Sequence, residues 1–197
     1  MHPEEIRQAV KLFDTADKWN AFLALSAQKD NLRNEMQRGA YERIKNHYYI
    51  KSNSAPEWSY KPLNPVEISM SWYLTEFGEN SICLVLGWGG QLVLEARGGD
   101  RFNLVGEAGR LLKHEKFGLL FTCLRVDAET DGQYLAGEEY NFSFGSANDG
   151  RFNGLSLAWY AHYHPEEFLT QVVEKISRFQ TPEMTALLIE LNQLTRK

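Results

Sequence analysis

The sequence predicts a single α+β domain over residues 1–197, with N-terminal helices, a central antiparallel sheet of about five or six strands and two C-terminal helices. Two changes of hydrophobic period predict this order. Apolar residues recur at helical spacing before residue 50 and after residue 165, and they alternate with polar residues in the stretch between. A chain of 197 residues is long enough to form one hydrophobic core.

The N-terminal segment, residues 1–50, is expected to be helical. Pro3 and the two glutamates after it are typical of a first helical turn. Two stripes of apolar side chains are expected to face the core: Ile6, Val10 and Phe13, and then Trp19, Phe22 and Leu23. Residues 51–65 are expected to be a connector, because their three prolines prevent a regular helix.

The sheet is expected within residues 66–164. Residues 66–75 alternate between apolar and polar, which is typical of a strand with one buried face, and Gly89-Gly90 predicts a tight hairpin. The expected strands are 66–75, 81–88, 91–97, 118–126, 139–144 and 155–163.

Two further helices are expected over residues 165–196. Pro165 with Glu166 and Glu167 suits the first turn of one helix, and Thr181 with Pro182 suits the N-terminus of the next.

Composition narrows the class of protein. The net charge is −5, and Cys83 and Cys123 each lie in an apolar run, so we expect buried thiols instead of a disulfide framework. The longest uncharged run contains glycines and polar residues, so no membrane span is expected. The N-terminus carries acids and no apolar segment of the secretory type, so we expect a cytoplasmic protein.

An acid-rich segment, residues 127–139, lies between the fourth and fifth expected strands. It contains five acidic residues and no Lys or Arg, so its charge equals that of the whole chain. We expect it to bind a basic partner protein by electrostatic steering and burial of a tyrosine. The expected partner-binding residues are Asp127, Glu129, Asp131, Tyr134, Glu138 and Glu139.

The same segment fits the template of a calcium-binding loop, with acids at positions 1, 3, 5 and 12 and Gly132 at position 6. Its flanks predict strands instead of helices, and Glu129 stands where a shorter acid or amide is usual. Calcium bound between Asp127 and Glu138 is one interpretation, and a solvated acidic hairpin loop is the other.

His162 and His164 lie two residues apart at the end of the last expected strand, where both side chains would project from one face. Glu166 is near enough in sequence to add a carboxylate, so His162, His164 and Glu166 are the candidate ligands of a transition metal. The other interpretation is an ordinary strand end followed by a capped helix.

Two further patterns concern nucleic acid. Residues 43–51 are rich in basic and aromatic residues, but the net charge from Lys29 to Lys61 is only +3, so nucleic acid is not the expected partner. Glu95-Ala96-Arg97 resembles the acidic-x-lysine element of metal-dependent nucleases, with arginine in place of lysine.

The sequence lacks a phosphate-binding Gly-Lys-Ser/Thr loop, a Gly-x-Ser-x-Gly elbow and a dinucleotide fingerprint. The leading hypothesis is therefore a non-enzymatic protein-binding domain, an acidic inhibitor of the immunity or antitoxin kind, that acts on a basic partner and needs no cofactor. The alternative is a metal-dependent hydrolase or nuclease that uses His162 and His164. The sequence does not predict an oligomeric state.

Overall fold

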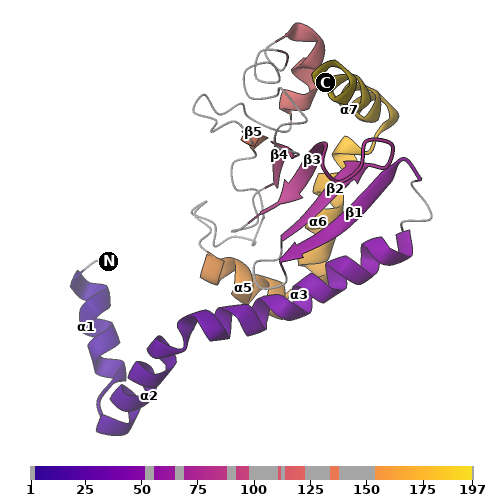
Figure 1. The fold of residues 1–197 in the computed structure, drawn as a ribbon. Coiled ribbons are helices and arrows are strands. Elements are labelled where there is room, and N and C mark those ends of the chain that lie inside the picture. Colours follow the sequence, from indigo (N-terminus) through magenta and orange to yellow (C-terminus); the bar gives the residue numbers. More distant parts are fainter. Residues whose placement is uncertain are drawn as a thin grey trace.

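The structure is a computed structural model that describes residues 3–51, 56–64, 69–87, 92–97, 111, 114–122, 134–137 and 154–196. It confirms the α+β class and the order of elements, with helices first, an antiparallel sheet in the middle and helices last (Figure 1). Within these residues, no helix combines the length and the apolar character needed to cross a membrane.

Three helices form the N-terminal segment: α1 (Pro3–Leu12), α2 (Ala16–Ala27) and α3 (Lys29–Lys51). Thr15 caps α2, because its extended backbone lets the side-chain hydroxyl accept a hydrogen bond from the Lys18 backbone N–H at 3.3 Å. Only one residue separates α2 from α3.

The sheet consists of β1 (Trp58–Asn64), β2 (Ser69–Leu74), β3 (Ile82–Leu86), β4 (Leu92–Ala96) and β5 (Tyr134–Gly137). The strands lie side by side in sequence order, and each is antiparallel to the next. Gly78 adopts a φ of +76° in the turn between β2 and β3, a conformation that glycine adopts without steric cost.

The C-terminal part contains the 3₁₀ helix η3 (Glu115–Thr122) and the helices α5 (Gly154–Tyr163), α6 (Pro165–Phe179) and α7 (Pro182–Thr195). The N-termini of α6 and α7 are those that the sequence predicts. Thr181 caps α7 by accepting a hydrogen bond from the Met184 backbone N–H at 3.3 Å.

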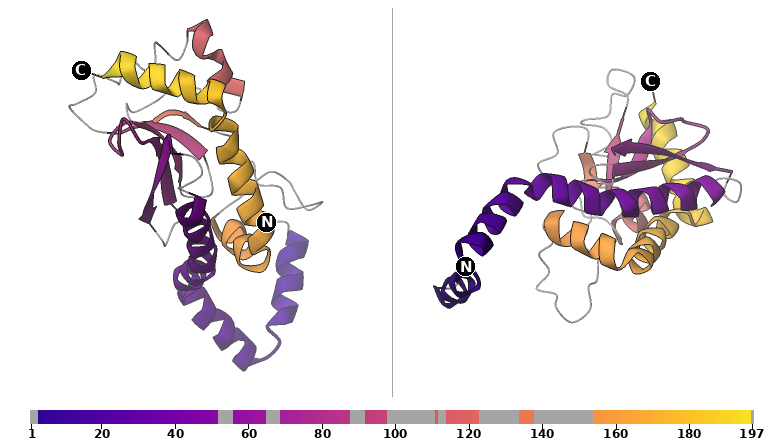
Figure 2. Two further views of the ribbon diagram at one scale, coloured as in Figure 1. Left: turned by 90° about the vertical axis from the view of Figure 1, so that its right-hand side faces the viewer. Right: turned by 90° about the horizontal axis from the view of Figure 1, so that it is seen from below.

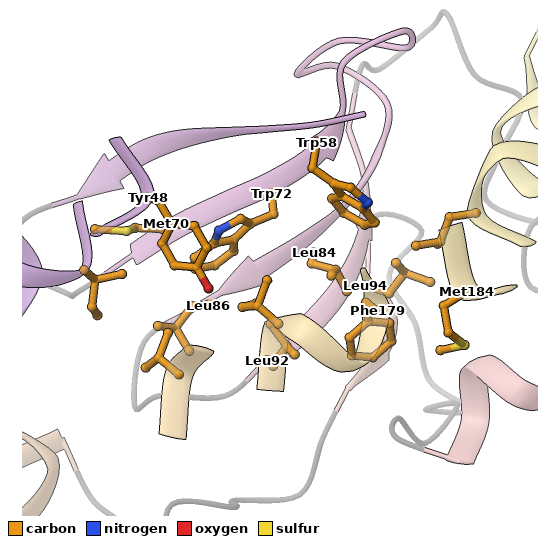
Figure 3. Close-up of a cluster of buried hydrophobic side chains, with 14 of the residues drawn as sticks. Tyr48, Trp58, Met70, Trp72, Leu84, Leu86, Leu92, Leu94, Phe179 and Met184 are labelled. Carbon is orange, nitrogen blue, oxygen red and sulfur yellow. The ribbon is translucent and has the colours of Figure 1, made fainter. Parts of the chain in front are cut away.

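The core lies between one face of the sheet and helices α3, α6 and α7 (Figure 3). Trp72 pairs with Leu84 and Leu84 with Leu94 across β2, β3 and β4, and all three side chains point to this face. Trp58 of β1 adds a polar tie, because its indole N–H donates to the Thr185 hydroxyl of α7 at 3.2 Å. Helices α3, α6 and α7 therefore pack against the sheet around one hydrophobic cluster.

The structure corrects several predicted elements. Residues 155–163 were expected to be a strand but belong to helix α5, and the described part of 118–126 belongs to η3. The expected strand 139–144 lies outside the described residues. Four strands of five to seven residues form the body of the sheet, and β5 adds four residues at the β4 edge. Of the expected strands, 66–75, 81–88 and 91–97 correspond to β2, β3 and β4.

The expected connector contains a strand that the prolines obscured. Pro62 lies in β1, which is the first strand in the sheet order and has only β2 as a neighbour. Proline has no backbone N–H to donate, and an edge strand tolerates this because no second strand lies beside it. Prolines exclude a regular helix, as predicted, but they do not exclude an edge strand.

Candidate protein-interaction surface

The most distinctive surface belongs to the N-terminal arm, which we define as residues 3–33: α1, α2 and the first turn of α3. Figures 1 and 2 show α1 and α2 projecting away from the sheet and the C-terminal helices. Helix α2 has no buried residue. Among the residues of these helices whose burial the structure describes, the first that is fully buried is Gln37 of α3, which lies beyond the arm. The arm therefore extends from the body without packing into its core.

Large apolar side chains on the arm are exposed. Trp19, Phe22 and Leu23 are 47%, 40% and 47% exposed, although the sequence predicted that they face the core. That prediction is wrong, because their helix does not pack on the body. The other exposed apolar side chains of the arm are Ile6, Val10, Leu12, Leu25 and Leu32.

Three aromatic rings fix the angle between α1 and α2. Phe13 lies in the bend, with its ring centroid 5.6 Å from that of Trp19 and 4.6 Å from that of Phe22. The Trp19 and Phe22 centroids are 5.4 Å apart. Aromatic contacts at these distances stabilise the bend, but three rings are too few to cover one another, so their outer surfaces still face solvent.

Charges on the arm pair locally. Arg7 lies 3.5 Å from Glu4, and Lys18 lies 2.6 Å from Asp14, each pair three or four residues apart. Arg33 contacts Asp30 at 3.3 Å in the same way. Each exposed pair contributes little stability, and the five acidic and five basic residues among residues 3–33 balance. The surface is therefore apolar, aromatic and close to electrically neutral.

The acidic residues predicted to bind a partner lie outside the described residues. Asp127, Glu129, Asp131, Glu138 and Glu139 belong to this group, as does the calcium-loop pattern that they form. Tyr134 begins β5, so the backbone of this residue pairs with β4. The structure places none of the segment's acidic side chains; Leu135 of β5 is buried in the core.

The candidate metal ligands lie at the junction of α5 and α6. His162 is exposed on α5, and His164 is the residue before the first turn of α6. The strand on which the pairing of the two histidines rested is wrong, because His162 lies in helix α5 and His164 lies after its end. Glu166 forms an ion pair with Arg43 of α3. Among the residues that the structure describes, no three His, Cys, Asp or Glu side chains are arranged to hold a metal ion.

Polar contacts at this junction hold α5 against α6. The His164 ring stacks on Tyr160 at 5.2 Å, and its Nδ1 lies 3.8 Å from the Glu167 carboxylate. The buried Tyr160 hydroxyl donates to Glu167 at 3.1 Å and accepts from Gln171 at 2.9 Å. Burial, with a further contribution from Glu167, raises the pKa of Tyr160 to about 12. These contacts account for His164 and Glu167 structurally.

The basic and aromatic residues around position 43 are also engaged. Lys45 pairs with Glu42 at 3.0 Å, and Lys61 of β1 pairs with Glu79. Tyr48 and Trp58 belong to the core, where desolvation raises the pKa of Tyr48 above its usual range. A strip that binds single-stranded nucleic acid needs free cations beside exposed rings. Tyr49 is 75% exposed, but Lys45 and Lys61 are already paired with carboxylates.

The remaining residues with candidate chemistry lie on the sheet. Glu95 and Arg97 of the nuclease-like pattern pair with each other at 3.1 Å. Cys83 is buried in β3, and desolvation raises the pKa of its thiol to about 12, so the thiolate is disfavoured. Neither feature provides a reactive group.

Comparison with known proteins gives no match: no family model, curated protein or solved structure is significantly similar to this chain. The functional argument therefore depends on the chain's own surface. The amphipathic pattern of residues 6–23 could have located the arm, but the pattern is the same for a helix that faces its own core and one that faces a partner.

Proposed function

We propose that this chain is a non-enzymatic protein-binding domain and that it binds its partner through the N-terminal arm. The observation that carries the proposal is the exposure of Trp19, Phe22 and Leu23 on a helix without a buried residue. Tryptophan and other aromatic residues are enriched at the points of protein interfaces that contribute most to affinity.

The energetic reason is the cost of leaving apolar side chains in water. Burying a fully exposed side chain of this kind contributes about 1.5–3 kcal/mol. The arm presents eight that are about half exposed, so each can still contribute about half of that. Exposed apolar surface of this extent is typical of a protein-binding site. A partner that covers the arm recovers this free energy, and the body supplies no cover of its own.

The finer form of the proposal is an acidic inhibitor, of the immunity or antitoxin kind, that acts on a basic partner. Residues 127–139, with five acids and no Lys or Arg, support it. In this form the acidic segment steers a basic partner toward the protein, and apolar contacts on the arm supply affinity.

The alternative function is a metal-dependent hydrolase or nuclease that uses His162 and His164. Its support is weaker, because α5 replaces the strand that would have aligned the two side chains. The described residues around the pair serve structural contacts, as shown by the ring stacking of His164 on Tyr160.

The proposal is tested by photocrosslinking in cells. A photoreactive amino acid replaces Leu23 of the arm in one variant and Leu194 of α7, which is 53% exposed, in the control variant. The expected result is a discrete protein adduct from position 23 and none, or a different one, from position 194. Equal and unspecific adducts from both positions would contradict binding through the arm.

The partner's identity then tests the finer form. An adduct with a basic protein whose binding weakens when the acids of residues 127–139 are changed to amides supports an acidic inhibitor. Binding that ignores these acids removes that form and leaves the arm as the binding surface.

A further inference from the structure

We infer that the arm binds the arm of a second copy of this chain, so that the protein is a symmetric homodimer. This inference rests on the proposed function, because it assigns an occupant to the same surface. Its symmetry is closed and two-fold, with the same patch buried on both copies.

The first argument is the size of the surface. Eight large apolar side chains of the arm are between 40% and 67% exposed. With about 170 Å² for a fully exposed side chain of this kind, they present on the order of 700 Å². A standard interface buries about 800 Å² on each partner, so two arms supply the apolar area that a stable dimer needs.

The second argument is charge. Residues 3–33 contain five basic and five acidic residues, a net charge of zero, whereas the whole chain carries −5. A two-fold interface brings each surface against itself, so a surface of one sign would repel its copy. The arm carries no such penalty, while the negative charge of the chain lies entirely on the rest of the protein. A basic partner or an anionic membrane would find no matching charge on the arm.

The third argument concerns the competing route by which two copies could associate through the β1 edge of the sheet. Pro62 offers no backbone N–H, and the pairing shifts between Pro62 and Asn64, which interrupts the ladder. Lys61 is exposed on the same strand. Proline, an irregular register and lysine are features that prevent pairing between edge strands. The apolar arm is therefore the better site for a second copy.

The geometry also suits pairing of helices. Helices α1 and α2 form a bent pair in Figure 2, held by the Phe13, Trp19 and Phe22 rings, and two such pairs can bury their outer faces as a four-helix unit. Helices of 10 and 12 residues are marginal in water without tertiary contacts. Dimerisation therefore stabilises the arm's own helices.

The test is sedimentation equilibrium of the full chain over a wide range of concentration. The wild-type protein is expected to be a dimer at micromolar concentration, and its helical circular dichroism is expected to fall as dilution dissociates it. Trp19→Ser is expected to raise the dissociation constant by about 100-fold, because one interface residue of this kind is lost on both copies. The matched control is Trp159→Ser, which removes a tryptophan of similar exposure, 51% against 47%, from α5 of the body.

A second pair of variants guards against loss of the bend. Leu25 lies outside the aromatic cluster and is 61% exposed, and Leu194 on α7 is 53% exposed. Leu25→Lys is expected to dissociate the dimer by bringing like charges into the interface, whereas Leu194→Lys is expected to leave it intact. Urea unfolding of each variant shows whether the body remains folded.

Three results would overturn the inference: a wild-type chain that is a monomer at the highest concentration, a dimer that survives both arm substitutions, or a dimer that either control abolishes. The photocrosslinking experiment separates this failure from that of the proposed function. A monomer whose arm crosslinks to a different protein retains the function and loses the dimer, whereas an arm without any specific adduct or self-association loses both.

Discussion

Asn192 provides the sharpest test of how the C-terminal helix holds the sheet. It is fully buried in α7, and its side-chain oxygen accepts a hydrogen bond from the Ile82 backbone N–H at 2.9 Å. Its amide nitrogen donates to the Leu188 carbonyl at 2.9 Å. One side chain therefore ties a helix near the C-terminus to the first residue of a central strand.

Replacing Asn192 by leucine keeps the branch point and the number of side-chain heavy atoms but removes both hydrogen bonds, and the larger volume of leucine can only add to the loss of stability. The Ile82 N–H then stays buried without its partner, which costs about 1–3 kcal/mol. The Leu188 carbonyl loses only an additional donor, so its contribution is smaller. We expect Asn192→Leu to lower the free energy of unfolding by about 2 kcal/mol, which corresponds to a fall of about 4–8 °C in Tm for a chain of this size.

The assay is urea unfolding followed by circular dichroism, with Gln193→Leu as the matched control. Gln193 is the next residue of α7 and is exposed, so its replacement is expected to change the free energy of unfolding by less than about 0.5 kcal/mol. If Asn192→Leu were as stable as the wild type, the bond to Ile82 would contribute nothing and the reasoning would be refuted.

Four further predictions concern single residues. Gly39→Ala in α3 is expected to raise the free energy of unfolding by about 0.5–1 kcal/mol in urea, because an added Cβ meets no atom within 4 Å; a loss of stability would contradict this. The Cys83 thiol has a pKa of about 12 in the folded protein, so little of it is thiolate. In a Cys123→Ser variant, we expect Cys83 to react with a disulfide reagent at least about 100-fold more slowly in the folded protein than in urea. Equal rates would refute its burial. The pKa of the Tyr160 hydroxyl is raised to about 12 in the folded state, against about 10 in the unfolded state. Its stabilising contribution is therefore complete below a pH of about 10 and is lost as the pH rises from about 10 to about 12. In Tyr160→Phe the free energy of unfolding, measured in urea, should fall less steeply over this range of pH. Zinc is expected to leave the Tm unchanged, whereas a stoichiometric metal that is lost in His162→Ala would favour the hydrolase alternative.

Patterns with local causes were the predictable part of the fold. Thr181 and Pro182 mark the start of α7 correctly, because a cap and a proline at the first turn depend only on neighbouring backbone groups. The alternation of Met70, Trp72 and Leu74 located β2 for the same reason. Such signals need no knowledge of what packs against them.

Patterns that depend on a distant partner were misleading. In residues 155–163 nearly every side chain is apolar or aromatic, so the period is ambiguous. Helix α5 contacts α3, and Leu157, Ala158 and Ala161 of α5 are buried. Packing against α3 therefore favours a helix over a strand in this segment. The sequence showed an apolar segment but not the helix that would pack on it.

The candidate surface was missed for a related reason. Trp19, Phe22 and Leu23 form an apolar stripe, and a stripe normally faces the core of its own chain. Nothing local distinguishes a stripe that faces a partner. The acidic segment drew attention instead, because concentrated charge is visible in a sequence without any structure.

The continuity of α3 has a mechanical consequence. This helix of 23 residues, about 35 Å long, runs without a break from the arm to its contacts with α5 and α6. A stiff rod transmits a tilt from one end to the other, whereas a flexible linker would absorb it. A partner that binds the arm can therefore stabilise the contact between α3 and α5. Slower amide exchange at that contact, far from the bound surface, would show this effect.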